Sequence, residues 1–328
     1  MRPILSVIMP VYNTSRYLKE SINSILNQKI DNIEFIIVND GSTDESENVI
    51  KSIMSENKNI MYFYQENSGQ GAARNLGISY ATGKYIYFMD SDDILKENTF
   101  LNLKNLLENK TLDAIFFDGE DFLDIIDNNL NKLTNTNYHK KESYGYYENG
   151  QDLWLDFINK KEFNVSPCLY IVKREILIEN NLFFFEGIIH EDQIFTTKLY
   201  FFINRCLHIN EIYFLRRVRS NSTMTSNKQL DKLYAYITIF KELYKFAKKY
   251  TWAKIDIKKA FFRYLSEIAV IINVLSNELD SDRDELEKIR KIVKNDKSFS
   301  IKAKLSFFNL PLYTMLGKVS KKLKRMFK

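Results

Sequence analysis

The chain has 328 residues, of which 45% are hydrophobic and 27% are charged. This balance excludes an intrinsically disordered chain, and the length indicates about two globular domains. The net charge of +5 is too small to indicate a nucleic acid as the partner.

Residues 1–117 alternate between short apolar segments rich in Ile, Val, Phe and Tyr and longer amphipathic ones. The apolar segments predict buried strands at 4–11, 33–40, 60–64, 84–90 and 113–118. The amphipathic segments predict helices at 16–28, 43–57, 70–81 and 96–109. Ser42 to Glu45 have the spacing of a capping box for the second helix. This alternation predicts an α/β fold with a mainly parallel sheet flanked by helices.

Polar residues follow four of these strands at the point where each strand ends. They are Tyr12-Asn13, Asn39 to Ser42, Glu66 to Gly69, and Asp90 to Asp93. Sheets of this kind bind ligands beyond the carboxyl ends of their strands. We therefore expect all four clusters to line one crevice.

Three carboxylates, those of Asp90, Asp92 and Asp93, lie within four positions after an apolar strand. Like charges this close repel one another, and a divalent cation would relieve the repulsion. A solvated loop that caps the next helix is the alternative reading. In extended backbone Asp90 and Asp92 would project to the same side, which suits Mg²⁺ or Mn²⁺ with substrate phosphates better than a Ca²⁺ cage.

The second cluster allows two interpretations, and the third is rich in glycine. Asp40 either accepts hydrogen bonds from a nucleobase or ribose or caps the helix predicted from residue 43. The glycine-rich segment 67–75 leads into a helix in the manner of a phosphate cradle, but it lacks the Lys-Ser/Thr of a Walker sequence. Arg74 is predicted near the start of that helix, where a cation opposes the helix dipole, and this placement hints at a function.

Residues 119–165 are polar and predict irregular structure, with an asparagine-rich surface loop at 127–141. After it, Glu191 and Asp192 precede a helical pattern. Acidic residues there either cap the helix or, for Asp192, supply a general base that takes a proton from a sugar hydroxyl.

Arg217 and Arg219 alternate along the strand predicted at 211–219. With Ser220 and Ser222 they could bind a diphosphate, and a solvated basic edge strand is the alternative.

Taken together, these segments resemble the family 2 glycosyltransferases, which are inverting enzymes of the GT-A fold. The resemblance runs from residue 3 to about residue 226 and rests on five motifs in the family's order: "SVIMPVYN", "EFIIVNDGSTDES", "ENSGQGAARNLGISYATGKYIYFMDSDD", "HEDQIF" and "YFLRRVRSNSTMTS". It implies a nucleotide-diphosphate sugar, most often a UDP-sugar, as the donor and Mg²⁺ or Mn²⁺ as the cofactor.

The resemblance also implies roles for individual residues. The uracil and ribose pocket would be lined by Pro10, Val11, Tyr12 and Asp40, with further base and sugar contacts from Asn67 and Arg74. Asp90 and Asp92 match the family's DxD motif, with Asp92 as the direct metal ligand. Asp192 would be the catalytic base, with Glu191 supporting the acceptor, and Arg217 and Arg219 would contact the diphosphate. No His follows these arginines, which leaves a third protein ligand for the metal in doubt.

The implied reaction moves a hexose or N-acetylhexosamine to a hydroxyl of a glycan or lipid-linked acceptor, in the assembly of bacterial surface polysaccharide. Inversion would convert an α-linked UDP-sugar into a β-glycoside. The Gln-x-x-Arg-Trp motif of processive relatives is absent, which favours one sugar per encounter. A sugar nucleotidyltransferase and a catalytically inactive carbohydrate-binding or scaffold module are the alternatives.

From about residue 228 the pattern is helical and amphipathic, so we expect one unit at 1–226 and a smaller helical unit at 227–328. Residues 312–328 predict a basic amphipathic helix, which either contacts an anionic membrane or packs on the protein. The helices at 228–295 could instead form a homodimer interface.

The N-terminal segment meets Pro10 and Asn13 early and lacks a small-residue cleavage site, so it predicts a strand and not a signal peptide. The two cysteines, Cys168 and Cys206, form no CxxC motif and indicate reduced thiols. No apolar segment approaches the roughly 20 residues of a membrane-spanning helix. We expect a cytoplasmic location, or a peripheral one on the inner face of the cytoplasmic membrane.

Overall fold

The computed structural model of the chain describes residues 2–108, 112–123, 141–218, 229–278 and 283–308. Most of the predicted asparagine-rich loop, Arg219 with Ser220 and Ser222, and the helix predicted at 312–328 lie outside these ranges. The described chain forms two compact units, Met1–Ser226 and Asn227–Lys328.

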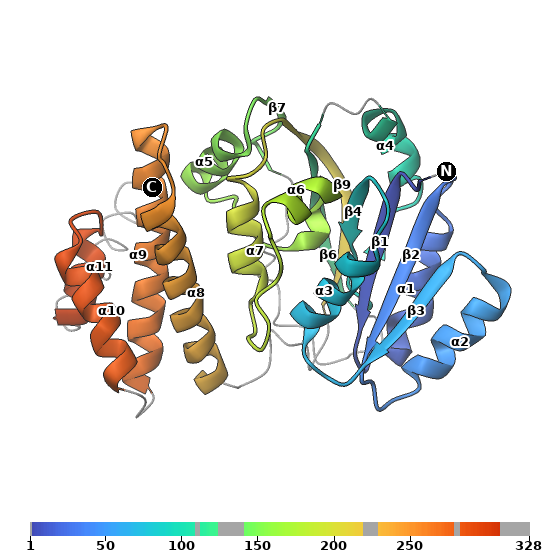
Figure 1. Cartoon of the computed structure of the whole chain (residues 1–328), viewed down its shortest axis with the longest axis horizontal. Coiled ribbons are helices and arrows are strands. Elements are labelled where there is room, and N and C mark those ends of the chain that lie inside the picture. The colour runs from blue at the N-terminus through green and yellow to red at the C-terminus, as the bar shows by residue number, and fades with distance from the viewer. Residues whose placement is uncertain (1, 109–111, 124–140, 219–228, 279–282, 309–328) are drawn as a thin grey trace. The chain divides into compact units, whose positions relative to one another are not determined.

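Four parallel strands form the first half of the sheet in the first unit (Figure 1). They are β1 (Leu5–Val11), β2 (Ile33–Asp40), β3 (Ile60–Gln65) and β4 (Tyr85–Phe88), in the order β3-β2-β1-β4. The helices between them are α1 (Ser15–Leu26), α2 (Ser46–Glu56) and α3 (Gln70–Tyr80). Every residue of β1 is buried, as expected for a central parallel strand covered on both faces. The four predicted strands and three helices are therefore confirmed.

The second half of the sheet is mixed. Next to β4 lies β8 (Tyr170–Lys173), which is antiparallel both to β4 and to β6 (Ala114–Leu123). Strand β9 (Cys206–Val218) is parallel to β6, and the short strands β5 (Ile94–Leu95) and β7 (Gly145–Tyr147) pair antiparallel with it. Helices α4 (Thr99–Glu108), α5 (Gly150–Lys160), α6 (Arg174–Glu179) and α7 (Asp192–Leu199) and the 3₁₀ turn η1 (Pro167–Leu169) connect these strands.

The predicted capping box is wrong. Helix α2 begins at Ser46, and its preceding residue Glu45 makes no side-chain cap. Instead the Asp44 carboxylate accepts hydrogen bonds from the backbone N–H of Ser46 and of Ser15, each at 3.0 Å. One carboxylate thus serves the first residues of two helices, which is favourable because both helix dipoles present positive ends there.

The prediction of irregular structure for 119–165 is also wrong in part. Strand β6 continues to Leu123, β7 follows at 145–147, and α5 occupies 150–160. The Asn149 side chain caps α5 by accepting a hydrogen bond from the backbone N–H of Asp152 at 2.9 Å.

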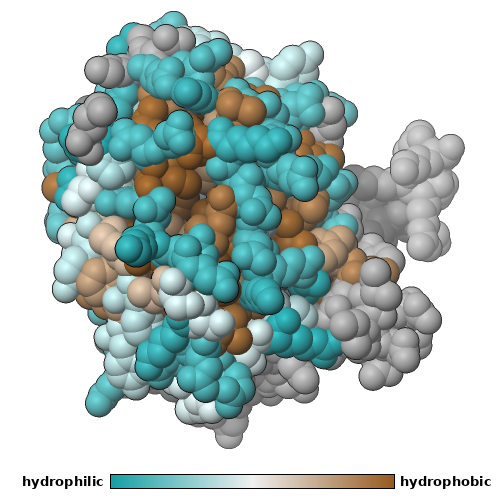
Figure 2. All heavy atoms as spheres, turned by 90° about the vertical axis from the view of Figure 1, so that its right-hand side faces the viewer, coloured by the Kyte–Doolittle hydropathy of each residue, from teal (hydrophilic) through white to brown (hydrophobic). Residues whose placement is uncertain are grey.

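The core of the first unit lies between the sheet and its helices. Leu18, Ile22 and Ile25 of α1 face apolar side chains of β1, β2 and β4 there. Strand β3 ends the sheet on the side turned to the viewer in Figure 2, where hydrophobic residues show between more numerous hydrophilic ones. Its side chains are mostly partly exposed, as suits an edge strand.

The second unit is helical, which confirms the predicted C-terminal helical region. It contains α8 (Gln229–Lys249), α9 (Ile255–Glu278), α10 (Arg283–Asn295) and α11 (Ile301–Phe308). Phe240, Leu243, Phe261, Leu265 and Ile289 are fully buried in its core. Within the described ranges, no helix combines the length and apolar character that crossing a membrane requires.

Candidate active site

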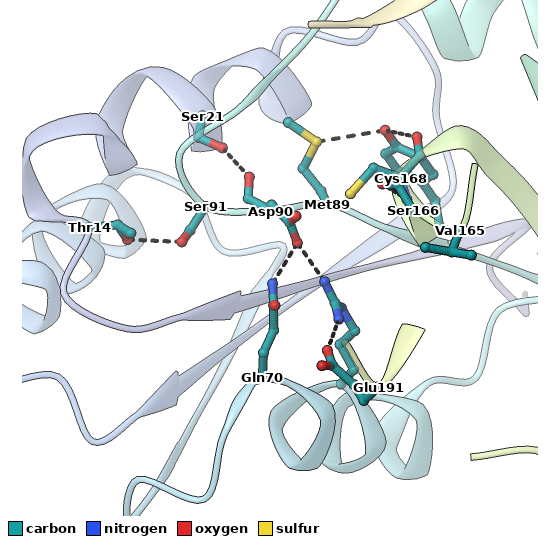
Figure 3. Close-up of polar contacts among 12 residues, drawn as sticks. Thr14, Ser21, Gln70, Met89, Asp90, Ser91, Val165, Ser166, Cys168 and Glu191 are labelled. Atoms are coloured by element: carbon teal, nitrogen blue, oxygen red, sulfur yellow. Dashed lines mark hydrogen bonds and ion pairs between the residues drawn. The ribbon is translucent and has the colours of Figure 1, made fainter. Parts of the chain in front are cut away.

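The polar clusters after β1, β2, β3 and β4 meet at one edge of the sheet, as predicted. Residues Val11 and Asn39 are paired in register, as are Asp40 and Gln65, so these strands end together. The loops are then tied to one another: Thr14 Oγ1 donates to Ser91 Oγ at 2.9 Å, across the ends of β1 and β4 (Figure 3).

Asp40 organises the loop that precedes α3. Its Oδ1 accepts hydrogen bonds from Gln65 Nε2 at 2.7 Å and from the backbone N–H of Ser68 at 2.8 Å, and its Oδ2 accepts from the backbone N–H of Gly69 at 2.9 Å. Gly69 directly precedes α3 and has a φ of 91°, a conformation that favours glycine. The anion at this helix N-terminus is therefore the carboxylate of Asp40, and the reading of Asp40 as a cap for α2 is wrong.

Gly41 explains how closely the second and third loops approach. A Cβ atom at this position would lie 2.7 Å from the backbone nitrogen of Asn67, and the φ of Gly41 is 69°. Only glycine avoids this clash and adopts this positive φ without strain. The close approach brings Asn67, which is exposed, beside the end of β2.

Arg74 joins two carboxylates that are distant in the sequence. Its Nη2 donates to Asp90 Oδ1 at 2.8 Å and its Nη1 donates to Glu191 Oε1 at 2.7 Å, and the residue is 2% exposed. Burial disfavours the charged guanidinium, but Asp90 and Glu191 more than compensate and raise the pKa of Arg74. These carboxylates account for a cation early in a helix, where the dipole opposes it.

The acidic cluster forms a turn, so the prediction of an extended Asp90–Asp92 backbone is wrong. The backbone N–H of Asp93 donates to the carbonyl oxygen of Asp90 at 3.3 Å. Asp90 is held from two other elements, because its Oδ1 accepts from Gln70 Nε2 at 2.9 Å and its carbonyl accepts from Ser21 Oγ at 3.1 Å (Figure 3).

Negative charge in this turn remains only partly compensated. Burial, with the nearby charges of Asp92 and Asp90, raises the pKa of Asp93 well above its ordinary value, although Asp93 accepts a hydrogen bond from the backbone N–H of Arg217 at 2.7 Å. Nowhere in the described ranges do three or more Asp, Glu, His or Cys residues gather into a metal-binding group. The turn can offer the carboxylates of Asp90 and Asp92, and Mg²⁺ and Mn²⁺ are cations that take one or two protein carboxylates and complete their shell with water and phosphate.

Arg217 lies against the same turn. Its Nε donates to the carbonyl oxygen of Asp92 at 2.9 Å and its Nη2 pairs with Glu20 Oε2 at 2.6 Å. The guanidinium also lies over the rings of Tyr17 and Phe122. The side chain of Arg217 is only 7% exposed. The alternative of a solvated basic edge strand is therefore wrong for this residue.

Asp192 is the first residue of α7 and follows the buried Glu191 that Arg74 binds. Its Oδ1 is buried and has no hydrogen-bond partner among the described residues. Burial, and next the charge of Glu191, raise the pKa of Asp192 to about 7, although Arg74 acts in the opposite direction. A carboxyl group that titrates near neutral pH and has an unsatisfied oxygen is suited to general-base chemistry.

The remaining predicted nucleotide contacts lie at the same edge. Pro10 and Val11 are buried at the end of β1, whereas Tyr12 is 47% exposed. Exposed Tyr12 and Asn67 are accessible to a ligand. That these residues line a nucleotide pocket stays a prediction.

The sequence patterns missed several residues that hold this site. Gln70 and Ser21 fix Asp90, and Asn75 binds the segment before Glu191. Gln70 lies four residues before Arg74, a spacing that places both side chains on one face of a helix and could have indicated their common partner.

Gly71 permits the close approach of Glu191 to α3. A Cβ at Gly71 would lie 3.0 Å from Cγ of Glu191 and 3.2 Å from the carbonyl oxygen of Phe185. We expect Gly71→Ala to lower the free energy of unfolding by about 1–3 kcal/mol, because the contacts are already tight. Urea unfolding measures this change. Ser79→Ala, on the exposed face of the same helix, is the control, and equal stabilities of the two variants would contradict the prediction.

Comparisons with known proteins agree with this fold and site. The family described as "Glycosyl transferase family 2" matches residues 6–178. The chain is 31% identical over 256 residues to "Glycosyltransferase GlyG" of Streptococcus pneumoniae, covering 73% of this chain and 79% of that protein. It is 47% identical over 106 residues to "Minor teichoic acid biosynthesis protein GgaB" of Bacillus subtilis, covering 31% of this chain and 12% of that protein.

A crystal structure of S. aureus TarS resembles the chain with a TM-score of 0.65 at 19% identity, covering 89% of this chain and 79% of that one. This likeness supports the predicted GT-A-like fold. Fold, site and relatives together define an enzyme that transfers sugars. The chain belongs to glycosyltransferase family 2, which excludes the alternative of a sugar nucleotidyltransferase.

Proposed function

We propose that this glycosyltransferase moves a hexose or N-acetylhexosamine from a UDP-sugar to a hydroxyl of a glycan or lipid-linked acceptor in bacterial surface-polysaccharide assembly. The observation that carries the proposal is the partly buried Asp192, with its pKa near 7, beside the Glu191–Arg74–Asp90 bridge. A structure of S. aureus TarS in complex with UDP-GlcNAc supports the donor class, at a TM-score of 0.62 and 20% identity. The teichoic acid name of GgaB supports the polymer class.

A divalent metal, Mg²⁺ or Mn²⁺, belongs to this proposal. Asp92 would be its direct ligand and Asp90 would assist, because these two carboxylates lie close enough that their charges, together with burial, raise the pKa of Asp93. When bound, such an ion stabilises the charge that develops on the departing diphosphate. The structure of a mannosyltransferase from Pyrobaculum calidifontis in complex with GDP-Man and Mn²⁺, with a TM-score of 0.56 and 16% identity, shares this fold.

The side chains of the chain itself would perform the remaining tasks. Asp192 takes the proton from the acceptor hydroxyl as its oxygen attacks the anomeric carbon, and the bond between that carbon and the diphosphate breaks with the electron pair leaving on UDP. Attack from the face opposite the leaving group inverts the anomeric centre, so an α-linked donor yields a β-glycoside.

Donor binding would fall to the loops at the sheet edge. Tyr12 and Asn67 are exposed for contact with the nucleoside, beside Pro10 and Val11. Asp40 would act mainly by holding the loop at Ser68 and Gly69. Arg217, which binds the acidic turn at Asp92, would contact the diphosphate together with Arg219, which lies beyond the described residues.

Three further parts of the proposal concern the surroundings of the enzyme. Contact of residues 312–328 with an anionic membrane, a homodimer formed through the helical unit, and a location at the inner face of the cytoplasmic membrane all stay predictions. Salt-sensitive liposome binding that is lost when the chain ends at residue 310 would support the membrane contact.

Asp92→Asn tests donor and metal binding together. We expect UDP affinity measured by calorimetry with MnCl₂ to fall by about 10-fold or more, because a direct metal ligand is weakened. Without metal the two proteins should bind UDP equally. Asp31→Asn, at an exposed carboxylate before β2, is the control.

The same preparations test the reaction itself. Incubation with a panel of UDP-sugars and Mn²⁺ should release UDP from at least one donor, and NMR of a product should show the inverted anomer. Unchanged manganese-dependent affinity in Asp92→Asn would remove the metal assignment, and a wild-type chain that binds no UDP would overturn the proposed donor.

A further inference from the structure

Asn75 of α3 binds the backbone of a distant segment with both ends of its side-chain amide. The backbone N–H of Phe184 donates to Asn75 Oδ1 at 2.8 Å, and Asn75 Nδ2 donates to the carbonyl oxygen of Phe184 at 2.9 Å. The same Nδ2 also donates to Glu186 Oε1 at 2.9 Å. Because the oxygen and the nitrogen of the amide bind the N–H and the carbonyl of the same residue, they fix both the position and the direction of the backbone at Phe184.

Phe184, held in this way, packs against the elements that carry the site. Its ring stacks on Phe195 of α7 with 3.9 Å between centroids, and it meets Phe88 at the end of β4 edge-on at 5.2 Å. The guanidinium of Arg74 lies 5.1 Å from the same ring. Phe184 therefore contacts the helix that begins at Asp192, the strand that leads to Asp90, and the cation that joins Asp90 to Glu191.

The segment from Phe184 to Glu191 is anchored to α3 at three neighbouring places. Asn75 holds its start, Gly71 makes room for the Phe185 carbonyl and for Glu191, and Arg74 binds Glu191. Between these anchors the chain forms no helix or strand, and both Gly187 and His190 have positive φ, at 77° and 61°. The place of Asp192 thus depends on anchors made by α3, because the connecting backbone has no regular structure of its own.

We propose that Asn75 is a positioning residue, which by holding Phe184 on α3 places Asp192 at the correct distance from the Arg74–Asp90 pair. This inference rests on the proposed role of Asp192 as the base and adds the residue that sets its position. The hydrogen bonds of Asn75 go to Phe184 and Glu186, which lie on the segment that leads to Asp192, so we expect its larger effect on the base.

Asn75→Asp keeps the size of the side chain and its acceptor for the Phe184 N–H. It removes both N–H donors and places a carboxylate against the Phe184 carbonyl and the carboxylate of Glu186. The Phe184 backbone must then shift, and a shift of about 1 Å at a reacting group costs about 100-fold in rate. We expect kcat to fall by about 10–100-fold with KM for the UDP-sugar and affinity for UDP unchanged.

The conservative rescue is Glu186→Gln in the Asn75→Asp background, which returns an N–H donor to the pair. We expect this double variant to recover part of the lost kcat.

Gln28 provides a matched control, because its side-chain amide also binds backbone groups with both its acceptor and its donor. The N–H of Phe100 donates to Gln28 Oε1 at 3.0 Å, and Gln28 Nε2 donates to the Lys96 carbonyl oxygen at 2.8 Å. Gln28→Glu should lower stability by a similar amount and leave kcat within about 2-fold.

Amide hydrogen exchange supplies a measurement that does not depend on turnover. In Asn75→Asp we expect faster exchange at residues 193–197, in the first turns of α7, and no change there in Gln28→Glu. Unchanged exchange at these residues overturns the proposal whatever the activity. If the enzyme is active, a kcat of Asn75→Asp equal to that of wild type also overturns the proposal, and so does an equal loss of kcat in Gln28→Glu. A wild-type chain that transfers no sugar would overturn the proposed function instead. The exchange measurement would then still test the positioning role of Asn75.

Discussion

Replacing Asp192 by Asn should lower the rate of sugar transfer by about 10²–10⁴-fold, because the acceptor hydroxyl loses the group that takes its proton. Affinity for UDP should stay the same, since Asp90, Asp92 and the loops at the sheet edge are untouched. In the wild-type chain the same carboxyl group makes transfer pH-dependent. Its pKa is about 7, so kcat/KM should fall as the pH drops below about 7 and level off above it.

Asp152 is the matched control for this substitution. Like Asp192, it lies in the first turn of a helix, that of α5, but far along the chain from the acidic turn. Asp152→Asn should keep both the rate and the pH profile. Transfer at a near wild-type rate by Asp192→Asn, or a pH profile that stays flat between pH 5 and 8, would remove Asp192 from the role of base.

The stability of the Asp192→Asn variant offers an independent measurement of the same environment. Burial raises the pKa of Asp192 from its ordinary value to about 7, so between about pH 4 and pH 7 the folded chain binds a proton that the unfolded chain has lost. The contribution of this group to stability therefore decreases as the pH rises through that range. Relative to wild type, the Asn variant should gain stability between about pH 4 and pH 7 and retain that gain at pH 8.

The strands and their polar ends could be predicted from the sequence because they depend on local patterns. Apolar segments such as 33–40 have the length and composition of buried strands, and parallel strands bring their carboxyl ends to one edge. Asp40 and Asp90 could be selected on this basis, because each lies where a parallel strand ends. That these two residues lie at the same edge follows from the topology.

The partners of these residues could not be predicted in the same way. Asp40 binds the loop before α3 and not α2, since hydrogen bonds from Ser68 and Gly69 depend on how two loops meet in space. Similarly, Asp44 serves two helices at once, which no capping-box spacing describes. The turn at Asp90 to Asp93 follows from contacts with Ser21, Gln70 and Arg217, which come from three separate parts of the chain.

The bridge between Asp90 and Glu191 is the clearest example of a feature that sequence patterns cannot reveal. The sequence distinguishes its central residue, Arg74, only because a cation early in a helix opposes the dipole. The reason for that placement is a carboxylate 117 positions further along the chain, and only the folded structure brings it within 2.7 Å. Because the bridge connects the turn at Asp90 to Glu191, the residue before Asp192, its removal should affect both stability and chemistry.

Arg74→Met should therefore be the most destabilising substitution at the site. It leaves the carboxylates of Asp90 and Glu191 without their shared cation, and breaking a buried ion pair in this way lowers the free energy of unfolding by about 3–5 kcal/mol. Arg74 also lowers the pKa of Asp192. Its loss should thus move the acidic limb of the kcat/KM profile to a pH above 7, which loss of stability alone would not do.

Lys173→Met separates the two effects, because Lys173 pairs with Asp113 at 2.6 Å at the other end of the sheet, where β6 begins. It should cost stability in urea unfolding and leave the pH profile in place. If Arg74→Met does not fold, Arg74→Lys keeps the charge but cannot bind two carboxylates with a planar fork, so the profile should still shift, by less. A profile that coincides with wild type in every foldable Arg74 variant would show that the bridge stabilises the fold without tuning the base.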